Sequence, residues 1–258
     1  MLKICVVGLS GRMGHSLFDC CQGLEGLKIV SGVAKNDTPM PVGFNGDVVE
    51  NVNALKEAPD IFIDFSRPDC SLTVLDYAKA HNCRVVLGTT GFDEDGKSKI
   101  VSTSHSVPIV FAANFSVGVN VSLALIKRTA AIMQDADLEI YEAHHRYKVD
   151  APSGTALAMG EAAAEARGVN LKDVMVEGRH GITGVRKYGT IGFSSVRGGD
   201  VVGEHKAMFL SDGERVVIEH VATSRATFAR GALRAAEWLS QKKPGLYTMN
   251  EVLGLDKL

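Results

Sequence analysis

The chain has 258 residues, and its hydrophobic content of 45% is ample for a sizeable folded core. The formal net charge is −2 at pH 7 without a basic block, which argues against a dedicated nucleic-acid-binding protein. No apolar run reaches the roughly 18 residues that a membrane-spanning helix needs, and the start of the chain predicts a strand rather than a signal peptide. The 5 cysteines include no CxxC pair and are typical of free thiols in a reducing cytoplasm, where we expect the protein.

A glycine-rich turn follows the first predicted strand. Residues 2–7 are apolar and β-branched, and Gly8-Leu-Ser-Gly11-Arg-Met-Gly14 leads from them into an amphipathic stretch. Strand, glycine turn and helix form the context of a dinucleotide fingerprint, although the spacing is G-x-x-G-x-x-G rather than G-x-G-x-x-G. An ordinary tight turn is the alternative. The residues that we predict to bind a dinucleotide here are Gly8, Leu9, Ser10, Gly11, Arg12 and Met13.

The end of the second predicted strand, residues 27–34, bears on the choice of cofactor. Lys35 and Asp37 follow this strand, about twenty residues after the glycines. An acidic residue at this place holds the ribose 2′-hydroxyl of NAD, whereas a basic residue accommodates the 2′-phosphate of NADP. Lys35 favours NADP and Asp37 favours NAD, and a solvated turn that binds neither is the alternative.

Three further strands are predicted at residues 60–65, 84–87 and 108–111, with helical stretches between them. This alternation indicates a doubly wound parallel sheet, in which ligands bind beyond the carboxyl ends of the strands. For Thr89, Thr90 and Asn114 the alternative role is capping and turn formation. The strand-end residues that we predict to bind the cofactor are Gly88, Thr89, Thr90, Ala112, Ala113, Asn114 and Phe115.

The pattern changes after residue 119. A long apolar helix is expected first, and strands at residues 190–196, 204–209 and 215–221 are expected later, joined by glycine-containing turns. This pattern predicts a mixed or antiparallel sheet that carries helices. A final helix is expected over residues 226–242.

Two domains are therefore predicted, and the fold class is α/β. Residues 1–115 and 226–258 are expected to form a Rossmann-type domain with a doubly wound parallel sheet, to which the C-terminal helix returns. Residues 116–225 are expected to form an α+β domain with a mixed sheet.

Ionisable residues are densest in the segment between a predicted strand and a predicted helix, Glu142-Ala-His-His-Arg-Tyr-Lys-Val-Asp-Ala-Pro-Ser-Gly-Thr-Ala156. Histidine and lysine can donate protons, and Glu142 and Asp150 can orient these cations by pairing with them. A metal site of His144, His145 and Asp150 is the alternative. It is disfavoured because adjacent side chains on a strand point to opposite faces.

The second half of this segment starts a helix. Ser153, Gly154 and Thr155 stand where capping residues are preferred and where backbone N–H groups form a seat for an anion. A nicotinamide-binding domain with a proton-donating, anion-holding loop predicts hydride transfer to or from a small carboxylate. A non-catalytic dinucleotide sensor and a metal hydrolase are the alternatives.

Four segments carry a resemblance to a known family. They are Gly8–Gly14, Gly88-Thr-Thr-Gly-Phe92, Phe111-Ala-Ala-Asn-Phe-Ser-Val-Gly118 and Glu142–Thr155. The chain closely resembles the 4-hydroxy-tetrahydrodipicolinate reductase (dihydrodipicolinate reductase) family of lysine and diaminopimelate biosynthesis. The resemblance implies reduction of a small cyclic dicarboxylate with NAD(P)H and loss of water, in a cytoplasmic homotetramer built by the second domain, without nucleic-acid or membrane partners.

The resemblance also implies roles for single residues. His144 would be the proton donor or acceptor and Lys148 a second donor, while His145, Gly154 and Thr155 would bind the substrate. One departure concerns the cofactor. Many family members carry an acidic residue followed by Arg where this chain has Ala34 and Lys35, so we expect NADPH to be preferred over NADH.

Overall fold

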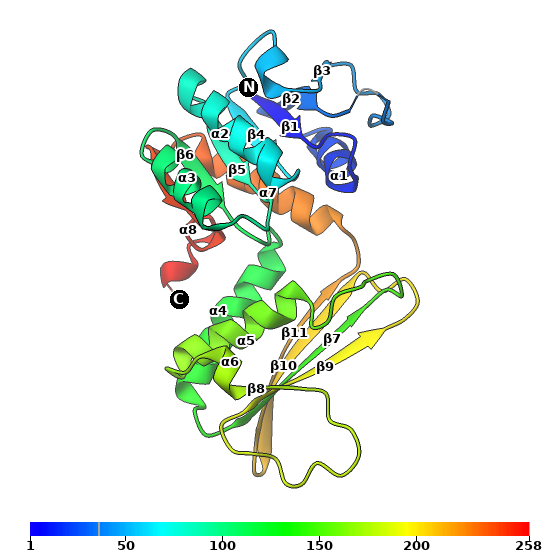
Figure 1. The fold of residues 1–258 in the computed structure, drawn as a ribbon, viewed down its shortest axis with the longest axis vertical. Coiled ribbons are helices and arrows are strands. Elements are labelled where there is room, and N and C mark those ends of the chain that lie inside the picture. The colour runs from blue at the N-terminus through cyan, green and yellow to red at the C-terminus, as the bar shows by residue number, and fades with distance from the viewer. Residues whose placement is uncertain (36, 258) are drawn as a thin grey trace. The chain divides into compact units, whose positions relative to one another are not determined.

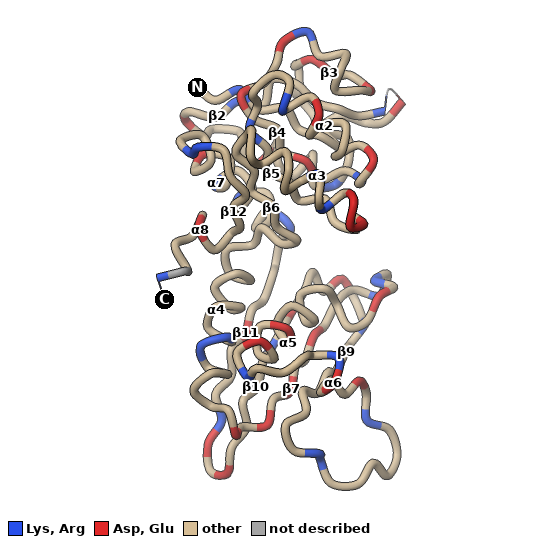
Figure 2. Tube along the Cα trace, turned by 60° about the vertical axis from the view of Figure 1, so that its left-hand side comes forward, with Lys and Arg blue, Asp and Glu red and all other residues tan. Residues whose placement is uncertain are grey.

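The computed structural model describes residues 1–35 and 37–257, which form two compact units. Unit 1 comprises Met1–Val117 and Arg225–Lys257, and unit 2 comprises Gly118–Ser224. Acidic and basic residues are interspersed along both units (Figure 2). In the part of the chain that the structure describes, no helix is long and apolar enough to cross a membrane.

Unit 1 is built on a parallel sheet of 7 strands in the order β12-β6-β5-β4-β1-β2-β3 (Figure 1). The strands are β1 (Leu2–Val7), β2 (Leu27–Val33), β3 (Asp47–Val49), β4 (Ile61–Asp64), β5 (Arg84–Leu87), β6 (Pro108–Phe111) and β12 (Gly245–Tyr247). The helices are α1 (Arg12–Cys21), α2 (Pro68–His81), α3 (Glu94–Ser104), α7 (Ala226–Leu239) and α8 (Met249–Leu253), with 3-10 turns η1 (Val52–Ala54) and η2 (Leu255–Lys257).

Both faces of this sheet are buried, because successive strand residues point to opposite sides. Ile4 and Val6 of β1 belong to a cluster that includes residues of α1 and α7. Cys5 and Val7 belong to a second cluster, with residues of α2 and α3. The predicted doubly wound parallel sheet is thus confirmed. All 5 cysteines are free, and burial raises the pKa of the Cys5 thiol to about 12.

Unit 2 is built on a mixed sheet of 5 strands in the order β11-β10-β7-β9-β8. β10 is antiparallel to β7 and β11, while β9 is parallel to β7 and β8, so the predicted mixed sheet is confirmed. The elements are α4 (Val117–Ile132), β7 (Asp137–His144), α5 (Gly154–Ala166), α6 (Leu171–Val174), β8 (Met175–Glu177), β9 (Ile191–Arg197), β10 (Gly203–Ser211) and β11 (Glu214–Ala222).

Helices α4 and α5 pack against one face of the mixed sheet (Figure 1). Leu138 and Ile140 of β7 point to this helix face and lie in the core with Met159 and Ala163 of α5. The close approach of α5 depends on Gly160, where a Cβ would lie 2.6 Å from the ring of Phe193.

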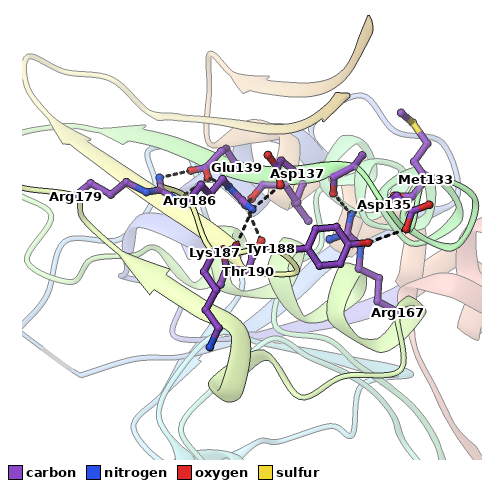
Figure 3. A network of polar contacts seen from close by, with 12 residues as sticks. Met133, Asp135, Asp137, Glu139, Arg167, Arg179, Arg186, Lys187, Tyr188 and Thr190 are labelled. Carbon is purple, nitrogen blue, oxygen red and sulfur yellow. Dashed lines mark hydrogen bonds and ion pairs between the residues drawn. The ribbon is translucent and has the colours of Figure 1, made fainter. Parts of the chain in front are cut away.

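The opposite face is held together by polar contacts near β8 (Figure 3). Glu139 of β7 accepts two hydrogen bonds from Arg179, at 2.8 and 2.9 Å, and one from Arg186, at 3.1 Å. Arg186 also donates to the Asp137 carboxylate at 2.7 Å and to the carbonyl of Thr190 at 2.6 Å. Both arginines come from the irregular segment 178–190, which they fasten to β7.

Candidate active site

Strand periodicity brings the first candidate residues together. Glu142 and His144 of β7 alternate with Ala143, so both point to the helix face of the mixed sheet. The His144 Nδ1 atom lies 2.7 Å from the Glu142 carboxylate. Glu142 is only 1% exposed, so the pair forms a buried carboxylate with a partly accessible histidine above it.

Arg197 of β9 completes this group, because it lies beside His144 in the parallel register of β7 and β9. Its guanidinium donates to both Glu142 oxygens, at 2.7 and 2.8 Å, and to the carbonyl of Asp150 at 2.6 Å. Burial alone would raise the pKa of Glu142, but hydrogen bonds from Arg197, Ser195 and His144 lower it to about 2. Glu142 is therefore a carboxylate near neutral pH.

The ionised carboxylate determines which nitrogen of His144 carries the proton. A carboxylate can only accept hydrogen bonds, so Nδ1 must donate to it and Nε2 is the nitrogen that can exchange a proton. Nε2 lies beside Gly203, where a Cβ would come within 3.2 Å. Burial lowers the pKa of His144 below its ordinary value, and the contact with Glu142 opposes that shift.

Lys148 and His145 occupy the loop after β7. Lys148 is 20% exposed, and its ammonium lies 2.7 and 2.8 Å from the two carboxylate oxygens of Asp150. The Lys148 N–H donates to the carbonyl of His145 at 3.1 Å. The His145 ring lies near that of Tyr147, with centroids 6.3 Å apart.

The second half of the loop forms the start of α5. Ser153 caps the helix, because its hydroxyl oxygen accepts a hydrogen bond from the Ala156 N–H at 3.2 Å. Gly154 and Thr155 are the first two residues of α5, which is the position where helices bind anions. A Cβ at Gly154 would meet no atom within 4 Å, so the backbone there is open.

His205 of β10 lies directly beneath this helix start. It pairs with Glu142 in the antiparallel register and is 4% exposed. Its Nε2 lies 2.9 Å from the hydroxyl of Ser153, and its ring is edge-on to that of His144 at 5.1 Å. Burial, with a smaller contribution from His144, lowers the pKa of His205 to about 4, so this ring is neutral near pH 7.

In unit 1 the predicted cofactor residues lie at the carboxyl end of the parallel sheet. Gly8 follows β1 with φ +85°, and its N–H donates to the carbonyl of Val33 at 2.9 Å. Gly11 precedes α1 without a side-chain cap, which leaves the helix start open to an anion. A Cβ at Gly14 would lie 2.1 Å from the carbonyl oxygen of Leu9, so only glycine fits there. This cradle suits a dinucleotide pyrophosphate.

Not every predicted cofactor residue can act through its side chain. Leu9 is fully buried over Gly32, so only its backbone remains for a ligand. Thr89 is 3% exposed and its hydroxyl donates to Asp64 at 3.2 Å, whereas Thr90 is exposed. Ser10 and Met13 are half-buried, Arg12 is exposed, and Lys35 is exposed just beyond β2.

The third strand-end segment packs around Phe65. The rings of Phe65 and Phe115 lie 5.5 Å apart, and a Cβ at Gly88 would lie 2.2 Å from the Phe65 ring. Asn114 accepts a hydrogen bond from the Ser116 N–H at 2.8 Å, so its side chain does serve a turn. Ala113 is exposed and Ala112 is half-buried.

Three polar residues of these sites were missed by sequence reasoning. Arg197 and His205 reach Glu142 and Ser153 only through the strand register, which periodicity does not reveal. Asp64 is fully buried at the end of β4 and accepts hydrogen bonds from the Ser66 N–H at 2.9 Å and the Ser66 hydroxyl at 2.6 Å. Burial raises the pKa of Asp64, although these hydrogen bonds act in the opposite direction. An acidic residue at the end of an apolar strand is the signal that could have found it.

A doubly wound sheet with an open glycine turn, joined to a mixed sheet with a histidine–carboxylate pair, is typical of dinucleotide-dependent oxidoreductases. Residues 2–115 match the family model for the dihydrodipicolinate reductase N-terminus, and residues 118–253 match that for the C-terminus. The chain therefore belongs to the dihydrodipicolinate reductase family, the NAD(P)H-dependent oxidoreductases that reduce 4-hydroxy-tetrahydrodipicolinate in lysine biosynthesis.

Solved structures share the fold. A dipicolinate-bound dihydrodipicolinate reductase from Paenisporosarcina sp. TG-14 is 23% identical with a TM-score of 0.81, over 96% of this chain and 97% of that one. A probable dehydrogenase from Thermotoga maritima is 9% identical with a TM-score of 0.64, over 98% and 93%. A scyllo-inositol dehydrogenase from Lactobacillus casei, with bound NAD(H) and scyllo-inositol, is 12% identical with a TM-score of 0.58, over 100% and 94%.

Proposed function

We propose that the segment from His144 to Thr155 carries out the proton transfer and the substrate binding of the reductase. His144 and Lys148 supply protons, while His145, Gly154 and Thr155 bind the cyclic dicarboxylate. The single observation that carries this proposal is the hydrogen bond of 2.7 Å between His144 Nδ1 and the buried Glu142 carboxylate. A histidine held in this way presents its other nitrogen for proton exchange.

The chemistry requires a proton as well as a hydride. Reduction with loss of water consumes one hydride and one proton and releases one water molecule, so an acid must protonate the departing oxygen. Either protonated His144 or the Lys148 ammonium can act as this acid. Bound NAD(P)H supplies the hydride.

The helix start supplies charge complementarity to the substrate. A carboxylate near Gly154 and Thr155 would meet backbone N–H groups and the positive end of the α5 dipole. The Lys148 ammonium adds a cation from the same loop. The structure from Paenisporosarcina sp. TG-14 was solved with dipicolinate, a small dicarboxylate of the kind that we propose for this site.

We further propose that the strand-end segments of unit 1 hold the cofactor. These are Gly8 to Met13, Gly88 to Thr90 and Ala112 to Phe115. The open start of α1 after Gly11 supports a pyrophosphate site. The exposed ammonium of Lys35 just beyond β2 favours NADPH over NADH, because it can pair with a 2′-phosphate.

The decisive assay measures NADPH oxidation with freshly made product of dihydrodipicolinate synthase. A non-catalytic sensor on the same fold would bind NADPH without oxidising it. Oxidation that depends on the fresh substrate is expected, and its loss in His144→Ala is the expected sign of the proton-transfer role. A wild-type protein that binds NADPH but leaves it reduced would contradict the proposal.

The quaternary state and the cytoplasmic location are also proposals. Val196, Val217 and Val221 are 46%, 46% and 48% exposed on the sheet face that carries no helix. An exposed apolar sheet face is a surface that further copies of the chain can cover. We propose a homotetramer, which light scattering after size-exclusion chromatography tests through the mass in solution. Monomers at micromolar concentration would contradict it.

A further inference from the structure

We propose that Glu142 is a positioning residue for both halves of the loop at once, orienting the proton-exchanging ring of His144 and fixing the anion seat at the start of α5. This inference rests on the roles proposed above for these two elements. Glu142 itself is too buried to take part in substrate binding, at 1% exposed.

The contacts of its two oxygens carry the proposal. Oε2 accepts from His144 Nδ1 at 2.7 Å and from Arg197 at 2.8 Å. Oε1 accepts from Arg197 at 2.7 Å and from the Ser153 N–H at 3.2 Å. Ser195 also donates to this carboxylate. An ionised carboxylate has about four acceptor positions, so none is left unused. A carboxylate that is held at every position is rigid, and so are the groups that it holds.

The first consequence concerns the tautomer of His144. Because Glu142 is ionised, neutral His144 must carry its proton on Nδ1, leaving the Nε2 lone pair to receive one. Without the carboxylate nothing in this contact would select that tautomer. Glu142 thereby assigns proton exchange to the nitrogen beside Gly203.

The second consequence concerns the charge around His144. Burial and the positive charges of Arg197 from β9 and Lys148 from the loop lower the pKa of His144, whereas Glu142 from β7 raises it. His205 from β10 lies edge-on to this ring and is neutral near pH 7. Removal of the Glu142 charge would leave these two cations unopposed. The protonated form of His144 would then become rarer at a given pH.

The third consequence concerns the anion seat. Ser153 is the residue that caps α5, and its N–H is held by Glu142 while its hydroxyl contacts His205 at 2.9 Å. Gly154 and Thr155 follow directly, so the position of their N–H groups depends on Ser153. One carboxylate thus fixes the position of His144 relative to the backbone N–H groups at the start of α5.

A purely structural ion pair is the competing explanation, and the chain offers a matched control for it. Glu139 also lies on β7, but it points to the opposite face, and its hydrogen bonds among the described residues come from Arg179 and Arg186. Glu139→Gln removes the same charge from the same strand. It should therefore reproduce any effect that arises only from the loss of an arginine–carboxylate pair.

The experiment compares full-length Glu142→Gln and Glu139→Gln by NMR titration of His144 and by steady-state kinetics with NADPH. In Glu142→Gln we expect a lower titration midpoint for His144, a kcat reduced by up to about a hundredfold and a raised KM for the dicarboxylate, as misplaced groups produce. In Glu139→Gln we expect an unchanged midpoint and a kcat within about twofold of wild type. Equal losses in both variants, or an unchanged midpoint in Glu142→Gln, would overturn the proposal.

A measurement on the wild-type protein covers the case in which Glu142→Gln fails to fold. Long-range proton–nitrogen NMR correlations above the His144 titration midpoint report the tautomer directly, and we expect the Nδ1–H form. The Nε2–H form would overturn the proposal even if the enzyme is fully active. Conversely, a wild-type protein without turnover would refute the proposed roles of the loop while this tautomer remained as expected, so the two failures are distinguishable.

Discussion

Glu139 and Glu142 lie on the same strand and are both held by arginine guanidinium groups, but they belong to two different regions of unit 2. Glu139 is 16% exposed and points to the face without helices, where its arginines fasten segment 178–190 (Figure 3). Glu142 is 1% exposed and points to the helix face, where it meets His144 and the start of α5. Burial would raise the pKa of each, and arginine hydrogen bonds lower both.

The difference arises from strand periodicity rather than from the ion pairs themselves. An odd number of steps along a strand moves a side chain to the other face. The same pairing chemistry therefore fastens a loop on one face and orders a candidate catalytic group on the other. Variants on the two faces should separate these two uses.

The largest expected effect is on turnover. Lys148→Ala removes a proposed proton donor from the loop that follows Glu142. We expect kcat to fall by about a hundredfold or more, as for the loss of other general acids. NADPH binding, measured by fluorescence titration, should be unchanged. The control Arg179→Ala removes a cation that pairs with Glu139 and should keep kcat near that of the wild type. Full activity in Lys148→Ala would remove this residue from the mechanism.

The next effect is on stability. Arg197→Met leaves the Glu142 carboxylate buried without its strongest partner, so the free energy of unfolding should fall by about 3–5 kcal/mol. Arg179 is 37% exposed and shares Glu139 with Arg186, so Arg179→Met should cost about 1 kcal/mol or less. Urea unfolding measures both. Equal costs would mean that the two carboxylates are equivalent.

The acid dependence of stability gives a smaller, graded effect. Folding lowers the pKa of Glu142 from its ordinary 4.5 to about 2, so its contribution is complete above pH 4.5 and is lost as the pH falls toward 2. The difference in unfolding free energy between wild type and Glu142→Gln should therefore narrow over this range. A difference that stays constant from pH 7 to pH 2.5 would contradict the lowered pKa.

The smallest expected effect concerns a residue of unit 1. Lys35→Ala should raise the KM for NADPH by about tenfold, the size of one lost charge contact to a phosphate, and that for NADH much less. Combined with Glu142→Gln, its effect on KM should be additive, because the two residues belong to different units. An equal rise for both cofactors would return Lys35 to the role of a solvated turn residue.

The fold could be predicted because its long elements carry clear periodicity. The parallel sheet and the mixed sheet were both expected, and so were the glycine turn after β1 and the helix after Ser153. Strands β3, β8 and β12 were missed because 3 residues contain too little of a period to distinguish from a loop. They are defined by their partners, which the local sequence does not show.

The candidate site could be predicted only as far as local sequence reaches. The segment from His144 to Thr155 can be recognised by its high density of ionisable residues, and its proposed roles stay predictions. Arg197 and His205 come from other strands, and only the register of β7 with β9 and β10 brings them to Glu142. Leu9 shows a second limit, because its side chain is buried in the core and only its backbone remains for the predicted contact with the cofactor.

Gly203 has a consequence for how His144 is confined. A Cβ there would stand 3.2 Å from Nε2, which is closer than side chains normally tolerate, while Nδ1 is anchored 2.7 Å from Glu142 on the other side of the ring. A methyl group there would require the imidazole to shift by a few tenths of an ångström, against its hydrogen bond to Glu142. Access to the proton-exchanging nitrogen therefore depends on the absence of a side chain at residue 203. Even alanine, the smallest replacement for Gly203, would place a methyl group over Nε2.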